Sequence, residues 1–447
     1  MKISSIRTPG LGDATYIFAH EGRGIVVDPQ RDVGRFLDQI TDLGVEVRFV
    51  LETHLHNDYV SGGRDLAERT GAELVIPAAG SVAFTHRPAF HLEDLDGGPF
   101  TVRPIHTPGH TPEHMSYLVL LDDEPVAVFS GGSLLVGSAG RPDLLGFDRA
   151  EQLARLQYIS VNRLAELPDR VGLYPTHGQG SFCTSTAAGE STSTIGTEKR
   201  TNPVLRYPNA DAFVDGQLAG LQPYPKYYAH MGPINLMGPT PLPVPTLPLL
   251  TPEAVPADAS LVDIRPQRSY AAAHVRGSYG IELSDQTGVW SGWLIPFDSP
   301  IVLIAGEGQD VVEANTQLER IGYDQQLGVV AGVEDLAALR DGTASYRLAS
   351  VDDVVREIDD GTDPQILDVR APGEWDDGHL PGSIHCYVPD LVDGVPEELD
   401  PDRPVWVMCV TGYRAEIAVT YLEAAGFEPI VVVGGGVPEA LRVTKTG

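Results

Sequence analysis

The stretch Cys409-Val410-Thr411-Gly412-Tyr413-Arg414 decides the fold of the C-terminal part of the chain. It lies between an apolar run, Pro404 to Met408, and a helix-like segment, Ala415 to Ala425. This order predicts a strand, a tight loop and a helix whose first backbone N–H groups point at the cysteine. Together with the charge of Arg414, these groups favour a thiolate. The loop suits a persulfide, a sulfenate or a phosphate ester.

The segments that flank this loop are also distinctive. They are Ile366-Leu367-Asp368-Val369-Arg370 and His379-Leu380-Pro381-Gly382-Ser383 before the loop, and Val431-Val432-Val433-Gly434-Gly435-Gly436 after it. The whole pattern resembles the rhodanese family of sulfurtransferases. The resemblance implies that Cys409 carries sulfur as a persulfide, which the loop amides and Arg414 stabilise. Phosphatases of this fold have a loop one residue longer, so the six-residue loop favours sulfur over phosphate.

The C-terminal half contains an internal repeat. Leu261-Val262-Asp263-Ile264-Arg265 matches residues 366–370, and Gly277-Ser278 matches residues 382–383, both at an offset of 105. The apolar run 300–304 matches residues 404–408 at an offset of 104. Strands that alternate with helices predict two α/β units with mainly parallel sheets.

The first copy lacks the residues of the sulfur site. Ala305 stands at the position of Cys409, and Asp310 stands at the position of Arg414. The first loop also contains Glu307, and two acids repel an anionic sulfur species. We therefore expect an inactive rhodanese-like domain over residues 251–345 and an active one over residues 346–447.

Three histidine clusters follow apolar strands in the N-terminal region. They are Thr53-His54-Leu55-His56-Asn57-Asp58-Tyr59, Thr107-Pro108-Gly109-His110-Thr111-Pro112-Glu113-His114 and Tyr174-Pro175-Thr176-His177-Gly178. Neutral imidazoles suit zinc and ferrous iron, and a carboxylate adds charge balance. Three such clusters at strand ends predict a metal centre.

The order of these clusters resembles the metallo-β-lactamase fold over residues 1–195. Its glyoxalase II and persulfide dioxygenase branches are the most similar. The resemblance implies an αββα sandwich with a metal at one edge. The matching metal positions are His54, His56, Asp58, His110 and His177.

Two positions depart from this family pattern. Tyr59 replaces a histidine of the first motif, and Gly132 replaces the metal-bridging aspartate that follows residues 129–131. The iron triad of persulfide dioxygenases is two histidines and that aspartate, so one arm of the triad is missing here. We therefore expect a single divalent metal, Fe(II) or Zn(II), on three histidines: His54, His56 and His110. The pair formed by Asp58 and His177 could supply a carboxylate to the same ion.

Other residues of the region have simpler interpretations. We expect Arg141 and Asp143, in a Gly-Arg-x-Asp turn, to form a structural pair. His86, His91 and His114 are expected to be surface residues or supports of the ligands rather than ligands.

The composition excludes several classes of protein. A length of 447 residues predicts two to four domains. The formal net charge of −31 disfavours nucleic acid as a partner. No apolar run is long enough to span a bilayer, and the first residues show no signal peptide. Three cysteines, Cys183, Cys386 and Cys409, indicate a reduced cytoplasmic protein.

Residues 196–250 are rich in proline, with a run from Pro239 to Pro245. Such a run favours extended structure and predicts a linker. We expect one short helix around Ala210 to Leu221. Tyr227, Tyr228, His230 and Met231 should pack the segment onto a domain.

Over nearly its whole length the chain resembles persulfide dioxygenase–rhodanese fusion enzymes. The resemblance implies that the metal and dioxygen oxidise a small persulfide, glutathione-like or coenzyme A-like, to sulfite. Cys409 would then pass a second sulfur to sulfite and give thiosulfate. It also implies a homo-oligomer. Two alternatives remain: a metal-dependent thioester or persulfide hydrolase fused to a sulfurtransferase, and a non-catalytic metal domain with a sulfur-carrying or persulfide-sensing rhodanese domain.

Overall fold

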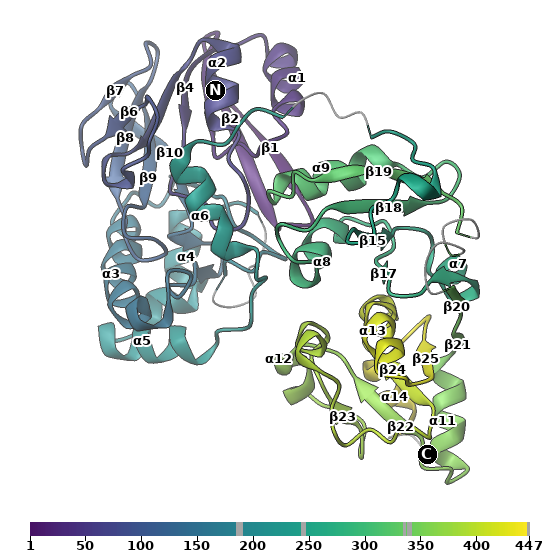
Figure 1. Cartoon of the computed structure of the whole chain (residues 1–447). Helices are drawn as coiled ribbons and strands as arrows, with labels where there is room; N and C mark the ends of the chain where they lie inside the picture. Colours follow the sequence, from purple (N-terminus) through teal and green to yellow (C-terminus); the bar gives the residue numbers. More distant parts are fainter. Residues whose placement is uncertain (185–190, 243–246, 334–336, 338–341, 445–447) are drawn as a thin grey trace. The chain divides into compact units, whose positions relative to one another are not determined.

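The computed structural model describes residues 1–184, 191–242, 247–333, 337 and 342–444. The chain forms two compact units. The first consists of Met1–Val244 with Glu319–Gly322, and the second consists of Pro245–Leu318 with Tyr323–Gly447. Figure 1 shows the elements of each unit along the chain.

Two six-stranded sheets form the first unit, in the orders β1-β2-β3-β4-β5-β6 and β14-β13-β10-β9-β8-β7. The strands of the first sheet are β1 (Lys2–Thr8), β2 (Asp13–His20), β3 (Arg23–Val27), β4 (Glu46–Leu51), β5 (Glu73–Pro77) and β6 (Arg87–Ala89). Those of the second are β7 (Leu95–Asp96), β8 (Thr101–His106), β9 (Met115–Leu121), β10 (Glu124–Gly131), β13 (Gly172–Pro175) and β14 (Ser193–Thr194). Pairing is parallel from β3 to β6 and between β10 and β13, and antiparallel elsewhere in these sheets.

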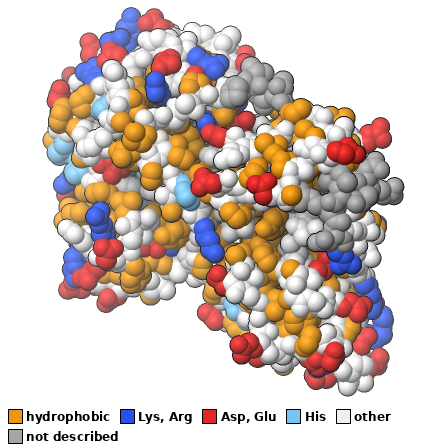
Figure 2. Space-filling model, in the orientation of Figure 1, with side chains coloured by type: hydrophobic (Ala, Val, Ile, Leu, Met, Phe, Trp, Pro, Cys, Tyr) orange, Lys and Arg blue, Asp and Glu red, His pale blue; other side chains and the backbone are white. Residues whose placement is uncertain are grey.

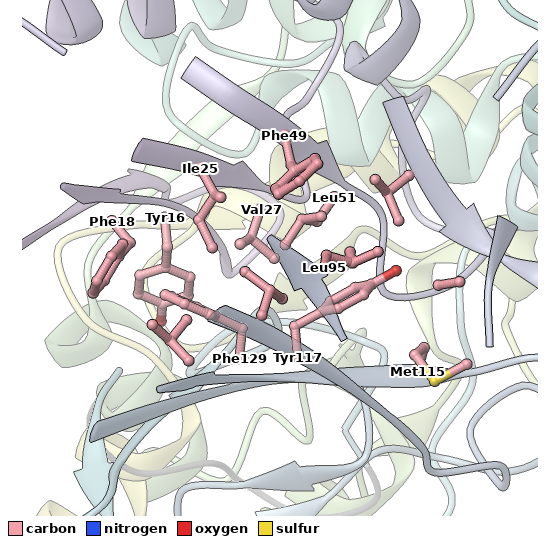
Figure 3. Packing of buried hydrophobic residues seen from close by; sticks show 14 of the residues in the cluster. Tyr16, Phe18, Ile25, Val27, Phe49, Leu51, Leu95, Met115, Tyr117 and Phe129 are labelled. Atoms are coloured by element: carbon pink, nitrogen blue, oxygen red, sulfur yellow. The ribbon is translucent and has the colours of Figure 1, made fainter. Parts of the chain in front are cut away.

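Apolar side chains of the two sheets meet in the centre of the first unit. Tyr16, Val27 and Leu51 come from the first sheet and are fully buried. Tyr117 and Phe129 face them from the second sheet, as Figure 3 shows. Alternate residues of each strand point to this shared core, which is the pattern of a sheet pair packed face to face.

Helices cover the outer face of each sheet. On the first sheet lie α1 (Gly34–Leu43) and α2 (Gly63–Thr70), which bury Phe36 and Leu66. On the second lie α3 (Phe147–Ala165) and α5 (Ala210–Ala219). In α3, buried residues recur at Leu153, Val161 and Leu164, the spacing of one helix face. The predicted αββα sandwich is confirmed.

Residues 196–250 contain more helix than a Pro-rich linker suggests. The segment holds most of α4 (Ile195–Thr201), α5 and α6 (Tyr228–Met237). Tyr227, Tyr228 and Met231 are buried, as expected, whereas His230 is exposed. Asn235 donates to the carbonyl oxygens of His56 (2.8 Å) and Tyr59 (2.9 Å), so the segment supports the first histidine loop. Residues 243–246 of the proline run lie outside the described residues.

Two parallel sheets and one short antiparallel pair, β16 (His274–Val275) with β20 (Thr343–Ala344), lie in the second unit. In the first half the order is β17-β15-β18-β19, with β15 (Ser260–Asp263), β17 (Tyr279–Gly280), β18 (Ile301–Ala305) and β19 (Gln326–Ala331). In the second half it is β21-β25-β24-β22-β23, with β21 (Arg347–Ala349), β22 (Gln365–Asp368), β23 (Ile384–His385), β24 (Val405–Met408) and β25 (Pro429–Val432). All pairings within these two sheets are parallel, as predicted.

Helices alternate with these strands in both halves. The first half has α7 (Gln267–Ala272), α8 (Thr287–Leu294) and α9 (Val311–Arg320). The second has α11 (Val351–Asp359), α12 (Pro372–Asp376), α13 (Tyr413–Ala424) and α14 (Val437–Thr444). A capping box between Ser350 and Asp353 starts α11.

The internal repeat extends to single contacts. Asp263 pairs with Arg265, and Asp368 pairs with Arg370, each with an Nη2–Oδ2 distance of 2.6 Å. Each guanidinium also donates to a backbone carbonyl eight residues further on, at 2.8 Å in both halves. The two halves therefore share a strand, an ion pair and a following turn.

On the face that Figure 2 shows, acidic side chains are spread out rather than gathered in one place. In Figure 2 they are interspersed with arginine and lysine on the visible face. Within the described part of the chain, no helix combines the length and the apolar character needed to cross a bilayer.

Candidate metal centre and candidate sulfur site

The three histidine clusters lie on loops that directly follow strands of the first unit. His54 follows β4, His110 follows β8 and His177 follows β13. All three side chains are buried, with at most 1% exposure. Burial is the main cause that lowers the pKa of each imidazole, and it keeps the rings neutral, which is the form that binds a metal.

The imidazoles of His54, His110 and His177 converge. One ligand nitrogen of each lies within 4.8 Å of the others. The Nε2 atoms of His54 and His177 are 3.3 Å apart. Two nitrogens bound to one tetrahedral zinc ion are about 3.3 Å apart, given Zn–N bonds of about 2.0–2.1 Å. The buried Nε2 of His110 has no hydrogen-bond partner among the described residues. The cluster therefore fits a divalent metal.

His56 belongs to a different set of contacts. Its Nε2 lies 3.2 Å from Asp28 Oδ1 and 3.2 Å from Glu52 Oε2, and the Tyr59 hydroxyl is 2.9 Å away. Burial alone would lower the pKa of His56, but the charge of Asp28 and hydrogen bonds to both carboxylates raise it well above its ordinary value. The structure thus groups His54 with His110 and His177, and separately groups His54 and His56 with Asp28.

Asp58 lies between these two groups. With His56 and His177 it forms a second set of possible ligands. Its Oδ2 is 3.3 Å from Nδ1 of His177. Burial, followed by the charge of Asp13, raises the pKa of Asp58 to about 7. All five metal residues named from the sequence are therefore neighbours, although they do not form one ligand set.

Three buried acids of this region are not evident as site residues from the motifs. Asp28 accepts hydrogen bonds from the backbone amide and the hydroxyl of Thr53, both at 2.7 Å, and from Thr176. It therefore ties the His54 loop to the His177 loop. Asp13 and Glu52 complete the group. The signal available for Asp28 is its place directly after the buried strand β3.

His114 supports the site without being free to bind a metal. Its Nδ1 lies 2.9 Å from the Thr107 hydroxyl, and its Nε2 accepts the backbone N–H of Gly132 at 2.9 Å. Arg141 and Asp143 form a buried two-pronged ion pair with distances of 2.7 and 2.8 Å. His86 is half-buried and His91 is exposed, and neither joins the described ligand groups.

The candidate sulfur site lies between β24 and α13. Cys409 is 1% exposed, and the backbone N–H of Gly412 donates to its Sγ at 3.1 Å. Gly412 has φ of 105° and precedes the helix. A Cβ there would lie 2.9 Å from the Val432 carbonyl oxygen, so the turn needs glycine. Val410 and Thr411 are exposed at the mouth of the loop.

Arg414 is a fixed cation at this site. Its Nη2 donates to Glu374 Oε1 at 2.8 Å, and its Nη1 donates to the other oxygen. Burial alone would lower the pKa of Arg414, but the pairing with Glu374 raises it above its ordinary range, and a negative charge on Cys409 would act in the same direction. The guanidinium can therefore stabilise an anion on the sulfur of Cys409.

The first half of the second unit contacts the sulfur loop. Gln267 Nε2 donates to the Gly412 carbonyl at 3.0 Å. The Tyr413 hydroxyl donates to the Glu282 carbonyl at 3.1 Å and accepts from the Ser284 hydroxyl at 3.2 Å. The copy without a cysteine thus holds both the end of the loop and the start of α13.

The other two cysteines have unfavourable surroundings for a thiolate. Burial raises the pKa of Cys183 well above its ordinary value. Burial, followed by the charge of Asp390, raises the pKa of Cys386 to about 11. The Sγ of Cys386 lies 3.9 Å from a carbonyl oxygen, not from an amide. Of the three cysteines, all of which lie within the described residues, only Cys409 combines an amide contact with a neighbouring guanidinium.

Two protein-family models match the chain. Residues 7–177 match the metallo-beta-lactamase superfamily. Residues 350–441 match the rhodanese-like domain. The two matched regions contain the histidine cluster and the Cys409 loop, respectively.

Curated relatives match the N-terminal part. A probable metallo-hydrolase of Burkholderia pseudomallei is 31% identical over 199 residues, which are 38% of this chain and 65% of the relative. A hydroxyacylglutathione hydrolase of Methylobacillus flagellatus is 29% identical over 164 residues, 36% of this chain and 60% of the relative. The chain thus spans less than two-thirds of the length of these relatives.

One solved structure matches most of the chain. It is a metallo-beta-lactamase from Staphylococcus aureus, 28% identical, with a TM-score of 0.68. The match covers 74% of this chain and 99% of the other. The similarity therefore extends well beyond the histidine-rich sandwich.

Proposed function

We propose that this chain, in which a metallo-β-lactamase-superfamily domain is fused to a C-terminal rhodanese-like domain, is an enzyme of sulfur metabolism. Its substrates would be small persulfides, glutathione-like or coenzyme A-like. Dioxygen would oxidise the terminal sulfur at a mononuclear metal site in the first unit. Cys409 would transfer sulfane sulfur to sulfite and form thiosulfate, which removes sulfide in a harmless form.

The observation that carries this proposal is the surroundings of Cys409. The Sγ atom receives a backbone N–H and lies near a guanidinium that Glu374 fixes in place. These groups stabilise a negative charge on a sulfur atom added to Cys409 without any rearrangement. The thiol is also free, as a sulfur carrier requires. Free cysteines fit a reducing compartment, and we propose the cytoplasm.

The transfer consists of two displacements at sulfur. The Cys409 thiolate attacks the outer sulfur of a persulfide R–S–SH, and the R–S⁻ thiolate leaves as the new S–S bond forms. Sulfite then attacks the outer sulfur on Cys409, which gives thiosulfate and regenerates the thiolate. No oxidant is needed in either displacement. Arg414 and the Gly412 amide hold the charged persulfide between the two events.

The first unit would supply the sulfite. The net reaction is R–SSH + O₂ + H₂O → R–SH + SO₃²⁻ + 2H⁺. A bound divalent metal supplies a Lewis acid and, as ferrous iron, a partner for dioxygen. The buried histidines would hold it, and Asp28 would keep the loops of His54 and His177 together through Thr53 and Thr176.

A hydrolase is the second candidate for the first unit. The match to a hydroxyacylglutathione hydrolase favours it, because that relative is named for a thioester-type substrate of glutathione. In this alternative a water molecule attacks the substrate and no dioxygen is consumed. The Cys409 site would keep the same role. A third candidate, a first unit without catalysis, leaves Cys409 as a sulfur carrier or sensor.

Oxygen uptake by the ferrous-loaded protein on addition of glutathione persulfide separates these candidates. We expect uptake and sulfite, with both lost in the His54→Ala and His110→Ala variants. In the Cys409→Ser variant, sulfite should accumulate in place of thiosulfate. Thiol release without oxygen uptake would establish the hydrolase instead. Neither reaction, with metal bound, would leave the carrier function.

A further inference from the structure

We propose that the metal of the first unit is held by three imidazoles alone, those of His54, His110 and His177, and that Asp13 fixes the third of them. The inference rests on the proposed function only for the presence of a metal. It adds the identity of the ligand set, which differs from a set that contains His56. It also names a positioning residue that no metal motif of the sequence includes.

Each of the three rings has its Nδ1 engaged by a hydrogen-bond acceptor. The acceptors are the Thr53 hydroxyl for His54, the Arg141 carbonyl for His110 and Asp13 Oδ1 for His177, each at 2.8 Å. The Thr53 hydroxyl gives its own proton to Asp28 at 2.7 Å, so it must accept from His54. All three rings therefore carry the proton on Nδ1 and the lone pair on Nε2.

Two of these lone pairs face each other. The Nε2 atoms of His54 and His177 are 3.3 Å apart, and neither carries a proton in the tautomers just described. Two lone pairs at this distance repel unless a cation lies between them. The Nε2 of His110 is buried and without a partner in the described part of the chain. A divalent ion satisfies all three atoms at once.

His56 lies outside the group that the other three rings form. Its Nε2 is surrounded by Asp28, Glu52 and the Tyr59 hydroxyl within 3.2 Å. Its buried Nδ1 faces Asp58, with Oδ1 4.0 Å away, and has no hydrogen-bond partner among the described residues. Its ring stacks on Tyr59, with ring centroids 4.2 Å apart. No described ligand group contains His54, His56 and His110 together. Tyr59, which replaces a family histidine, thus belongs to the hydrogen-bond network that holds the His56 ring.

At Gly132, where the family has an aspartate, the space for a side chain is not empty. A Cβ at this position would lie 2.2 Å from Cδ2 of His110. The His110 ring therefore occupies the space in which a side chain at position 132 would begin. Any carboxylate there would have to displace the ring. The third ligand must come from elsewhere, and His177 is the residue that the fold places opposite His54.

Three neutral ligands leave the full positive charge of a divalent ion uncompensated by its own ligand set. Asp13 and Asp58 are the nearest carboxylates to His177, and both lie behind its Nδ1 atom. An imidazole-only site with an open position therefore favours an anionic ligand there. A thiolate or persulfide anion is the class of substrate that meets this requirement.

X-ray absorption of the zinc-loaded full-length protein tests the ligand set directly, because imidazole rings give a characteristic outer-shell scattering. Metal analysis of the same sample gives the stoichiometry. We expect one zinc ion per chain with three imidazoles, and two imidazoles in His177→Gly protein, with weakened binding. Added free imidazole should restore the third ring. Two ions per chain, or two imidazoles with a carboxylate in the unaltered protein, would overturn the proposal.

Matched variants separate positioning from ligation. His56→Gln should keep one zinc ion and three imidazoles, whereas Asp13→Asn should weaken zinc binding by about 10–100-fold with three imidazoles retained. A loss of one imidazole in His56→Gln would assign the third ligand to His56 and contradict us. Sulfur transfer through Cys409, measured on the same samples, reports on folding. It also reports on the proposed function independently, since its failure would leave the ligand count unaffected.

Discussion

The loops 305–310 and 409–414 occupy the same place in the two halves of the second unit, but they satisfy the following helix in different ways. In the first loop Asp310 accepts the Glu313 amide at 3.0 Å, as an N-cap does. Gln309 accepts the Gly306 amide at 2.7 Å and donates to the Ile264 carbonyl at 2.7 Å. In this loop, the side chains of Gln309 and Asp310 therefore occupy backbone amides that could otherwise bind an anion.

The second loop leaves such an amide to the sulfur atom. No side chain caps α13, and the Gly412 amide points at Cys409 instead. Arg414, at the position of Asp310 in the first loop, lies in the first turn of that helix. A sulfur site in this fold therefore needs backbone amides that no side chain occupies and a fixed cation, as well as a cysteine. The first half of the second unit, which lacks the cysteine, still has a role, since Gln267 and Glu282 contact Gly412 and Tyr413 of the active loop.

The largest effect in this comparison is expected from removal of the cation. Arg414→Met should lower thiosulfate:cyanide sulfur transfer by about 100–1000-fold, the loss typical of one stabilising group around a developing anion. Arg414→Lys keeps the charge but loses the two-pronged pairing with Glu374, so its activity should be intermediate. Arg356→Met removes an exposed arginine of α11 and is the matched control. Equal activity in Arg414→Met and the control would contradict the role of the cation.

A pH-dependent stability is expected at the contact between the halves. Glu416 on α13 is buried, and this burial, together with Glu282 and Asp263, raises its pKa from 4.5 to about 9. The folded state then binds the proton more tightly than the unfolded state. The free energy of unfolding should decrease as the pH rises from about 4.5 to about 9, by at most about 1.4 kcal/mol per pH unit.

Glu416→Gln should remove this contribution, because the amide does not ionise. Urea unfolding of both proteins at about pH 5.5 and about pH 8, each roughly one unit inside that window, measures the difference. The stability gain of the variant should be larger at the higher pH. A gain independent of pH would show that Glu416 titrates normally in the folded protein.

A smaller effect on sulfur transfer is expected from a substitution in the first half of the second unit, which lacks the cysteine. Gln267→Ala removes one hydrogen bond to the Gly412 carbonyl, which is worth about 0.5–1.5 kcal/mol, so sulfur transfer should fall by about 2–10-fold. The decrease should appear in kcat and in the rate of Cys409 alkylation, since the loop loses its fixed geometry. Gln325→Ala, at an exposed position of the same half, is the control. Unchanged kinetics would make the contact merely structural.

The smallest effect on sulfur transfer is expected from a cysteine placed in the loop 305–310. Ala305→Cys should add no sulfur-transfer activity, because Gln309 already accepts the Gly306 amide of that loop and Asp310 accepts the Glu313 amide of the following helix. The test is made in a Cys409→Ser background, where any activity is visible. Appreciable transfer would mean that a thiol in this fold suffices, and the comparison between the loops would fail.

Much of the architecture follows from the sequence because its signals are local. The repeat, the strands that end at Asp263 and Asp368, and the Cys409 loop are all evident over short windows. The helices of residues 195–237 are less evident from the sequence, because glycine and proline in this segment are typical of loops rather than helices. Pro233 lies within α6 itself.

The metal centre could be predicted as a group of residues but not as a ligand set. His54 and His177 are 123 positions apart, and Asp13 contacts His177 across 164 positions. Which nitrogen of each ring is engaged depends on these distant partners. The spacing along the chain suggests that His54 and His56 bind the same metal. In the structure, Nε2 of His56 instead contacts the buried carboxylates of Asp28 and Glu52.

The most direct test of the central claim is the mass of the intact protein after incubation with thiosulfate, followed by mapping of the added sulfur. We expect one sulfur atom on the peptide that contains Cys409, its removal by cyanide, and no addition to the Cys409→Ser variant. Sulfur on Cys183 or Cys386, or equal addition to the Cys409→Ser variant and to the unaltered chain, would contradict it.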